Sequence, residues 1–150
     1  MRVALGSDHA GYSLKKQVAE FLLSRGVELT DCGAFSEERV DYPDYGFDVA
    51  EKVARGEADA GVLVCWTGIG MSMAANKVNG IRAALCRDVQ CAELSRQHND
   101  ANILVLSCLQ TPPKEAFEIL AKWLDTPFSN DERHIRRIRK LSEIENERGT

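Results

Sequence analysis

The sequence predicts an α/β fold: a three-layer, doubly wound, Rossmann-like sheet of five parallel strands with helices on both faces. Five short apolar runs each lead into a polar or glycine-containing turn, and helical patterns fill the gaps between them. Strands that alternate with helices pair in parallel through right-handed crossovers, which favours an open sheet covered on both sides. The predicted strands are residues 3–6, 27–32, 61–65, 82–86 and 103–107.

Apolar residues at helical spacing predict four longer helices between and after these strands. Their expected inner faces are Leu14, Val18, Phe21 and Leu22; Phe47, Ala50 and Val53; Val89, Ala92 and Leu94; and Ala116, Ile119, Leu120 and Trp123. Asp88 is the expected N-cap of the third of these helices, because an aspartate accepts hydrogen bonds from first-turn N–H groups. A shorter helix is expected over residues 71–76.

A final helix is expected over residues 131 to about 147, with one apolar stripe that faces the core or a partner. The stripe holds Ile135, Ile138, Leu141 and Ile144. Arg133 and Arg137 lie four residues apart, so their side chains could clamp one phosphate, although a solvated basic face is an equal alternative. Because no internal repeat or linker divides the chain, residues 1–150 are expected to form a single domain.

Composition argues against several kinds of partner and site. The formal net charge of -4 gives no electrostatic reason to expect a nucleic acid or an anionic membrane. The five cysteines include no C-x-x-C pair and the three histidines are scattered, so neither a disulfide framework nor a metal site is expected. No apolar run approaches the ~20 residues of a membrane span, and the N-terminus lacks a signal-peptide pattern. We therefore expect a cytoplasmic protein with reduced thiols.

The segment from Cys65 to Ser72 is the most informative part of the chain. It places a thiol and a hydroxyl, those of Cys65 and Thr67, at the carboxyl end of a strand and before a glycine-rich turn. Ligands of open α/β sheets bind at such ends. Gly68 and Gly70 let the backbone approach a ligand, and the following helix would direct N–H groups at an anion, which favours a thiolate and an oxyanion. The alternative is a small, buried, structural cysteine.

Other polar residues have both a catalytic and a structural interpretation. Asp8 and His9 follow the first predicted strand, where Asp8 could orient a sugar hydroxyl or cap the next helix. His98 could act as a general acid or base, or cap the end of its helix. His134 is expected at the surface. A thiol, a hydroxyl, an imidazole, an anion-binding turn and an arginine pair together fit proton abstraction next to the carbonyl of a phosphorylated sugar.

Several ordered motifs carry a resemblance that spans nearly the whole sequence. They are Gly6-Ser7-Asp8-His9-Ala10-Gly11, Asp41-Tyr42-Pro43-Asp44-Tyr45, Cys65 through Ser72 with Ala74-Ala75-Asn76-Lys77, Gly80-Ile81-Arg82-Ala83, Leu94-Ser95-Arg96-Gln97-His98-Asn99-Asp100-Ala101-Asn102, and Arg133-His134 with Arg137. On these motifs the chain resembles the type B ribose-5-phosphate isomerases, in the family that also includes galactose-6-phosphate isomerases.

The resemblance implies an aldose–ketose isomerase that interconverts ribose 5-phosphate and ribulose 5-phosphate through a cis-enediolate, without a metal or an organic cofactor. It implies that Cys65 is the base that moves a proton between C1 and C2. It also implies that Thr67 and the backbone of the turn hold the substrate oxygens. The turn residues concerned are Trp66, Thr67, Gly68, Ile69 and Gly70.

By the same resemblance, His98 would open the furanose ring with help from Asp8, and Asn99 would contact the sugar. The phosphate would be bound by His9, Arg133 and Arg137. Each site would be built from two subunits, which implies a homodimer or a dimer of dimers that binds a small phosphorylated sugar.

Two departures from the family pattern bear on the substrate. Trp66 stands where the family usually has glycine, and Leu109 stands where it commonly offers a further phosphate-binding arginine. One lost charge-assisted contact would cost on the order of 1.5–3 kcal/mol of binding free energy. The sequence therefore leaves open another sugar or sugar phosphate, such as a hexose 6-phosphate, and also a non-catalytic sugar-phosphate binding protein.

Overall fold

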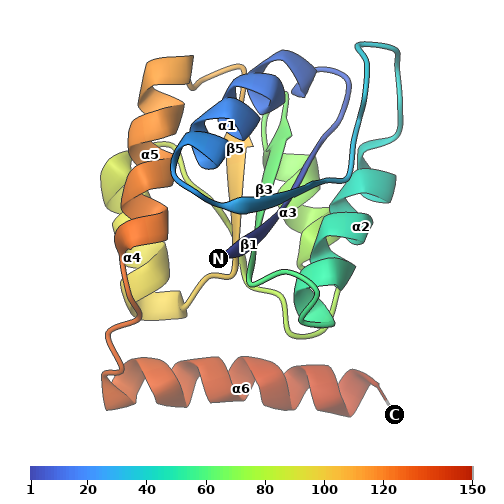
Figure 1. The fold of residues 1–150 in the computed structure, drawn as a ribbon. Helices are drawn as coiled ribbons and strands as arrows, with labels where there is room; N and C mark the ends of the chain where they lie inside the picture. The colour runs from blue at the N-terminus through green and yellow to red at the C-terminus, as the bar shows by residue number, and fades with distance from the viewer. Residues whose placement is uncertain (150) are drawn as a thin grey trace.

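A sheet of five parallel strands in the order β2-β1-β3-β5-β4 runs through the computed structural model, which describes residues 1–149 (Figure 1). The strands are β1 (Arg2–Ser7), β2 (Glu28–Asp31), β3 (Ala60–Cys65), β4 (Ala83–Leu85) and β5 (Ile103–Ser107). The helices are α1 (Tyr12–Ser24), α2 (Tyr42–Ala54), α3 (Ile69–Ala75), α4 (Val89–Asn99), α5 (Pro113–Asp125) and α6 (Glu132–Arg148). The predicted fold class is confirmed.

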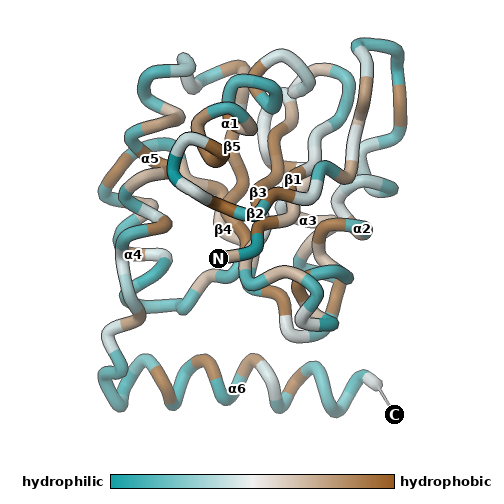
Figure 2. Tube along the Cα trace, viewed as in Figure 1, coloured by the Kyte–Doolittle hydropathy of each residue, from teal (hydrophilic) through white to brown (hydrophobic). Residues whose placement is uncertain are grey.

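The central strand β3 is buried along its whole length, between β1 on one side and β5 on the other. This burial explains its continuous apolar sequence, since a parallel strand covered on both faces has no polar side. Two separate cores result. Leu5, Val64 and Leu106 pack under α1, α4 and α5, while Leu63 and Val105 pack under α2 and α3. Figure 2 shows the apolar residues concentrated along the strands and on the inner sides of these helices.

Two residues predicted to lie in the core are exposed, because the buried face of each helix is rotated from the predicted one. Phe47 of α2 is 40% exposed and Leu94 of α4 is 37% exposed. Helix α2 instead buries Gly46, Val49 and Ala50. At Gly46 a Cβ would lie 3.0 Å from the Cβ of Ala74, so the small residue lets α2 pack closely against α3.

Element ends differ from the prediction by one or two residues. Strand β4 is three residues long rather than five, although the N–H of Cys86 still donates to the carbonyl of Val105 at 3.1 Å. Helix α3 begins at Ile69, two residues before the predicted start. The expected N-cap of α4 is confirmed, because the Asp88 carboxylate accepts from the N–H of Cys91 at 2.7 Å.

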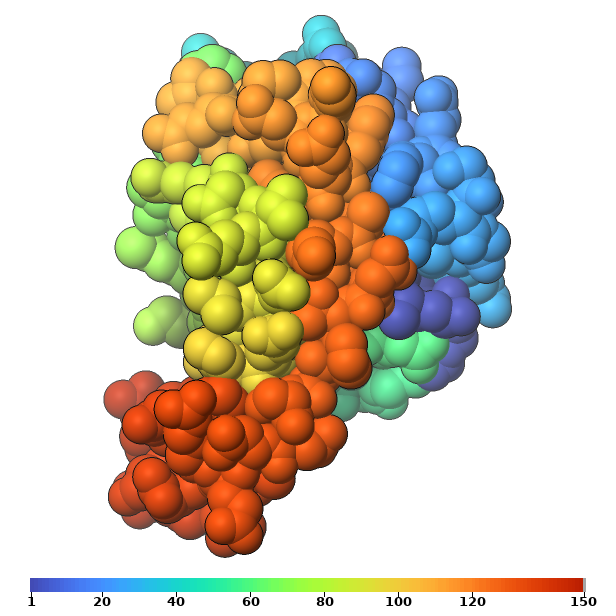
Figure 3. All heavy atoms as spheres, turned by 90° about the vertical axis from the view of Figure 1, so that its left-hand side faces the viewer, coloured from blue at the N-terminus to red at the C-terminus, as the bar shows by residue number. Residues whose placement is uncertain are grey.

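Helix α6 lies across the amino edge of the sheet, apart from the helices that cover its faces (Figures 1 and 3). It is confirmed close to its predicted bounds, and Asp131 caps it by accepting from the N–H of Arg133. At its far end, the N–H of Gly80 donates to Oε2 of Glu145 at 3.0 Å. The apolar stripe is only partly covered, since Leu141 is 50% exposed and Ile144 is 46% exposed. No helix within residues 1–149 is long and apolar enough to cross a membrane.

Replacement of Leu63 by alanine tests the core beneath α2 and α3. Leu63 is completely buried, so Leu63→Ala should lower the free energy of unfolding by about 2–5 kcal/mol in urea denaturation. Leu23 on α1 is 57% exposed, and Leu23→Ala should change it by less than about 0.5 kcal/mol. Equal effects of the two substitutions would contradict this assignment of the core.

Candidate active site

The turn that follows β3 folds back over the side chain of Cys65. The Cys65 thiol is buried, and its Sγ accepts a hydrogen bond from the N–H of Gly68 at 3.0 Å. Oγ1 of Thr67 accepts from the N–H of Ile69 at 3.2 Å. Gly68 has a φ of +78°, and a Cβ there would lie only 2.4 Å from Cδ1 of Leu85, so this position requires glycine. Two N–H groups of the predicted anion-binding turn are therefore engaged by Cys65 and Thr67.

Burial opposes ionisation of the Cys65 thiol. Its pKa is raised above the ordinary value, chiefly by desolvation and further by the nearby Asp8 carboxylate. Backbone N–H groups of Met71, Gly68 and Thr67 lower the same pKa, as the sequence predicted for this turn. Their effect is smaller than that of burial. The turn therefore favours the thiolate, as expected, but burial outweighs this effect within the single chain and keeps the pKa of Cys65 above its ordinary value.

Asp8 and His9 follow β1 at the edge of the sheet where β3 ends at Cys65, because the two strands are paired and end together. Oδ1 of the buried Asp8 accepts from the N–H of Gly11 at 2.9 Å, which is the capping role given as its structural alternative. Nδ1 of His9 accepts from the N–H of Val40 at 3.2 Å. The neutral His9 ring therefore carries its proton on Nε2, where it can donate to an anion.

The remaining residues of the turn line its outer side. Trp66 is 53% exposed, and its carbonyl accepts from the Ser107 hydroxyl at 2.8 Å and from the N–H of Leu109 at 3.0 Å. Ile69 is also exposed. A Cβ at Gly70 would lie 2.8 Å from the ring of Tyr42, so glycine permits the close packing of α2 against this turn.

A second group of predicted site residues lies at the opposite edge of the sheet. His98 and Asn99 end α4, and Arg133 and Arg137 are exposed on successive turns of α6. Strand β5 has five residues, and at about 3.3 Å per residue it separates the two edges by about 16 Å. Within one chain, His98 therefore does not reach Cys65. The structure groups the predicted residues into two sets, one at each edge.

His134 belongs to this second group, and its predicted surface position is wrong. It is only 4% exposed, and its ring packs on that of His98 with centroids 4.3 Å apart. Its Nδ1 lies 2.9 Å from the hydroxyl of Ser129, whose own N–H donates to the carbonyl of Gln97. The segment before α6 thus folds back onto the end of α4. Burial, helped by the charge of His98, lowers the pKa of His134.

The sequence did contain a signal for this burial. His134 precedes Ile138 by four residues, which places it on the same stripe of α6 as the predicted apolar residues. Arg133 and Arg137, four residues apart, lie next to each other on one side of that stripe. Arg133 makes a salt bridge to Asp131 at 3.3 Å, with both side chains largely in solvent.

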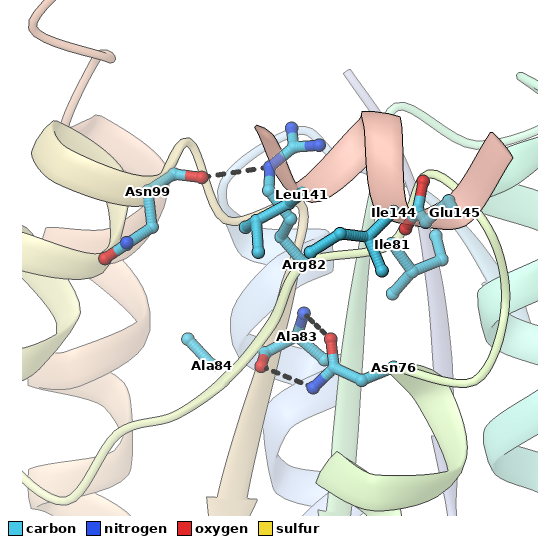
Figure 4. Close-up of a pocket in the computed structure, with 9 residues that line it drawn as sticks. All are labelled: Asn76, Ile81, Arg82, Ala83, Ala84, Asn99, Leu141, Ile144 and Glu145. Atoms are coloured by element: carbon cyan, nitrogen blue, oxygen red, sulfur yellow. Dashed lines mark hydrogen bonds between the residues drawn. The ribbon is translucent and has the colours of Figure 1, made fainter. Parts of the chain in front are cut away.

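A cavity of about 440 Å³ lies between α6 and the start of β4 (Figure 4). Its lining residues are Asn76, Ile81, Arg82, Ala83, Ala84, Asn99, Leu141, Ile144 and Glu145. The side chain of Asn76 bonds both backbone groups of Ala83, and Nε of Arg82 donates to the carbonyl of Asn99 at 2.9 Å. These polar groups are hydrogen-bonded to other groups of the protein. None of the strand-end residues around Cys65 lines the cavity.

Neither the thiols nor the acidic residues form a metal centre in the described part of the chain. All five cysteines are free, and no three His, Cys, Asp or Glu side chains among residues 1–149 are grouped as metal ligands would be. Three other thiols are also protonated at neutral pH. Burial raises the pKa of Cys32 to about 12, that of Cys86 to about 12 and that of Cys108 to about 11.

The fold is that of a Rossmann-like α/β protein, a class whose ligands bind at the carboxyl edge of the sheet. Residues 3–141 match the family described as Ribose/Galactose Isomerase. The chain belongs to this family and is an isomerase.

Curated and solved relatives cover nearly the whole chain. Ribose-5-phosphate isomerase B of Escherichia coli (strain K12) is 44% identical over 147 residues, 98% of each protein. The structure of Clostridium thermocellum ribose-5-phosphate isomerase B matches with a TM-score of 0.96 and 48% identity, over 98% of this chain and 99% of that one. The Mycoplasma genitalium enzyme, solved with bound ribulose 5-phosphate, matches with a TM-score of 0.92 and 40% identity, over 97% of each chain.

The raised pKa of Cys65 predicts slow alkylation at neutral pH. Because less of the thiol is ionised than in a free cysteine, iodoacetamide should modify Cys65 slowly at pH 7. The rate should increase with pH about a midpoint above the ~8.5 of an unperturbed thiol. Peptide-resolved mass spectrometry measures this rate, with a short cysteine peptide as the reference and Cys65→Ser as the control for site assignment. A midpoint below that of the reference peptide would contradict the prediction.

Proposed function

We propose that this protein interconverts ribose 5-phosphate and ribulose 5-phosphate, with Cys65 as the base. The observation that carries the proposal is the match along nearly the whole chain to ribose-5-phosphate isomerases B, together with a buried thiol at the end of the central strand. The Mycoplasma genitalium relative, solved with bound ribulose 5-phosphate, supports the choice of substrate.

In the proposed reaction, the Cys65 thiolate removes the proton from C2 of the open-chain aldose and returns it to C1. The hydroxyl proton moves from O2 to O1 as the cis-enediolate collapses to the ketose. Thr67 and the N–H groups of residues 66–70 would stabilise the developing oxyanion, for which those of Gly68 and Ile69 must first leave Cys65 and Thr67. Since burial raises the pKa of Cys65, substrate binding or a partner must supply further stabilisation of the thiolate. The transfer moves only protons, so we propose that it needs neither a metal nor an organic cofactor.

The other predicted residues take roles at the two ends of the sugar. We assign opening of the furanose ring to His98 with Asp8, and a sugar contact to Asn99. Neutral His9 offers its Nε2–H to the phosphate, together with Arg133 and Arg137. His134 packs on His98 and limits its motion.

A complete site of this kind requires two chains. Cys65, Thr67, Asp8 and His9 lie at the carboxyl edge of the sheet, whereas His98, Asn99 and the two arginines lie at the amino edge. A homodimer, or a dimer of dimers, would bring the carboxyl edge of one chain to the amino edge of its partner. We place this enzyme in the cytoplasm, where five free thiols remain reduced.

Trp66 and Leu109 are the two residues that favour a different substrate. Both are exposed at the carboxyl edge, where they add apolar surface beside the proposed site. An isomerase of a hexose 6-phosphate or of an unphosphorylated sugar would use the same base. A non-catalytic sugar-phosphate binding protein would bind ribose 5-phosphate without turnover.

The first test is steady-state conversion of ribose 5-phosphate to ribulose 5-phosphate in the presence of a chelator. Turnover is expected, and Cys65→Ala should reduce it about 10²–10⁴-fold because the proton acceptor is lost. Cys91→Ala is the matched control, and it should retain activity. Allose 6-phosphate and ribose are compared in parallel. Turnover of allose 6-phosphate or ribose alone would show that the substrate is not ribose 5-phosphate. Binding of a sugar without turnover of any would contradict the proposed isomerase activity.

A mixing experiment tests the two-chain site. Cys65→Ala and His98→Ala, each inactive alone, should regain about a quarter of wild-type activity after joint refolding, because half the dimers are mixed and each has one intact site. Cys65→Ala mixed with Thr67→Val is the control. Both substitutions lie at the same edge, so no mixed dimer has an intact site. Continued inactivity of the first mixture would contradict the shared site.

A further inference from the structure

Lys15 is a charged side chain enclosed in the interior. It lies on α1 and is 1% exposed, although the adjacent Lys16 is in solvent. Its Nζ donates to Oδ1 of Asp31 and to the carbonyl of Ala34, both at 2.6 Å, and lies 5.1 Å from the centre of the Phe35 ring. A buried ammonium is costly unless it is paired, and an apolar residue in its place would avoid that cost. The position therefore calls for a specific reason.

These Lys15 contacts lie at the last residue of β2 and in the segment that follows it. Oδ1 of Asp31 accepts a second hydrogen bond, from the N–H of Gly33 at 2.9 Å. The chain then runs beside β1. There the backbone N–H of Ser7 donates to the carbonyl of Gly33, and the backbone carbonyl of Ser7 accepts from the N–H of Ala34, both at 2.7 Å. Ser7 immediately precedes Asp8. Lys15 thus fixes the backbone that pairs with the end of β1.

The same segment leads into the loop of residues 35–41, which rises between β2 and α2 at the carboxyl edge (Figure 1). The far end of this loop returns to the candidate site, because the N–H of Val40 donates to Nδ1 of His9 at 3.2 Å. That bond places the His9 proton on Nε2. A chain of contacts therefore connects Lys15 to the tautomer and the orientation of the His9 ring.

We propose that Lys15 is a positioning residue for the phosphate of the substrate. By holding residues 31–34, it fixes the 35–41 loop and keeps the Val40 N–H on His9, so that His9 presents Nε2–H to the phosphate. The proposal rests on the proposed function for the identity of the ligand. It assigns a role to a charge that the proton-transfer steps do not use.

The kinetic test combines Lys15→Met with His9→Ala. Lys15→Met should raise KM for ribose 5-phosphate by about tenfold and change kcat by less than about twofold, because it weakens a contact present in both ground and transition states. In the His9→Ala background, the same substitution should raise KM by less than about twofold, since the contact it supports is already lost. Lys16→Met is the matched control, and it should leave KM unchanged. Equal effects of Lys15→Met in both backgrounds, or a loss of kcat alone, would overturn the proposal.

A measurement without turnover separates this inference from the proposed function. Hydrogen exchange of the Val40 amide should be about tenfold faster in Lys15→Met than in the wild type or in Lys16→Met. If Lys15→Met does not fold, Asp31→Ala removes the same pairing from the more exposed partner and should accelerate the same amide. Unchanged Val40 exchange would reject the role of Lys15 even in an active isomerase. Faster exchange in a protein inactive on ribose 5-phosphate would reject the proposed substrate and retain the anchoring of the loop.

Discussion

The pairing of β3 with β1 and β5 is the constraint on which the rest of the structure depends. Register places Ser7 beside Val64 and Cys65 beside Ser107, so the ends of three strands coincide at one edge. Asp8, His9, Cys65 and Thr67 all follow from this register, because each occupies a strand end or the residues just after it. A shift of one residue in either pairing would turn the thiol to the opposite face of the sheet.

Much of this arrangement could be predicted from local patterns, since alternation of apolar runs and helical stripes specifies the fold class. The failures have physical causes. Phe47 satisfied helical periodicity, but α2 packs closely on α3 through Gly46, which rotates the buried face by one position. The position of His134 on the apolar stripe of α6 indicated burial, but its packing on the end of α4 depends on the fold-back of the intervening segment through Ser129, which has no strong local signature.

Cys65 shows two requirements acting in opposite directions. A strand end deep in the sheet fixes the position of the thiol, but the same burial opposes the negative charge that Cys65 would need as the proposed base. Three N–H groups of the turn reduce this conflict without removing it. The sequence could indicate which donors surround the thiol, but it could not indicate their strength relative to desolvation, because that balance depends on how completely α2 and α3 cover the strand.

The protonated state of Cys65 also has a consequence for oxidative damage. Peroxides react with thiolates far faster than with thiols, and oxidation beyond the sulfenic acid is largely irreversible. Burial that raises the pKa of the resting thiol therefore protects the residue that we propose as the base, during the time when no sugar occupies the site. Cys32, Cys86 and Cys108 share this protection. In the proposed reaction, the same burial means that Cys65 ionises only when the substrate or a second chain completes its surroundings.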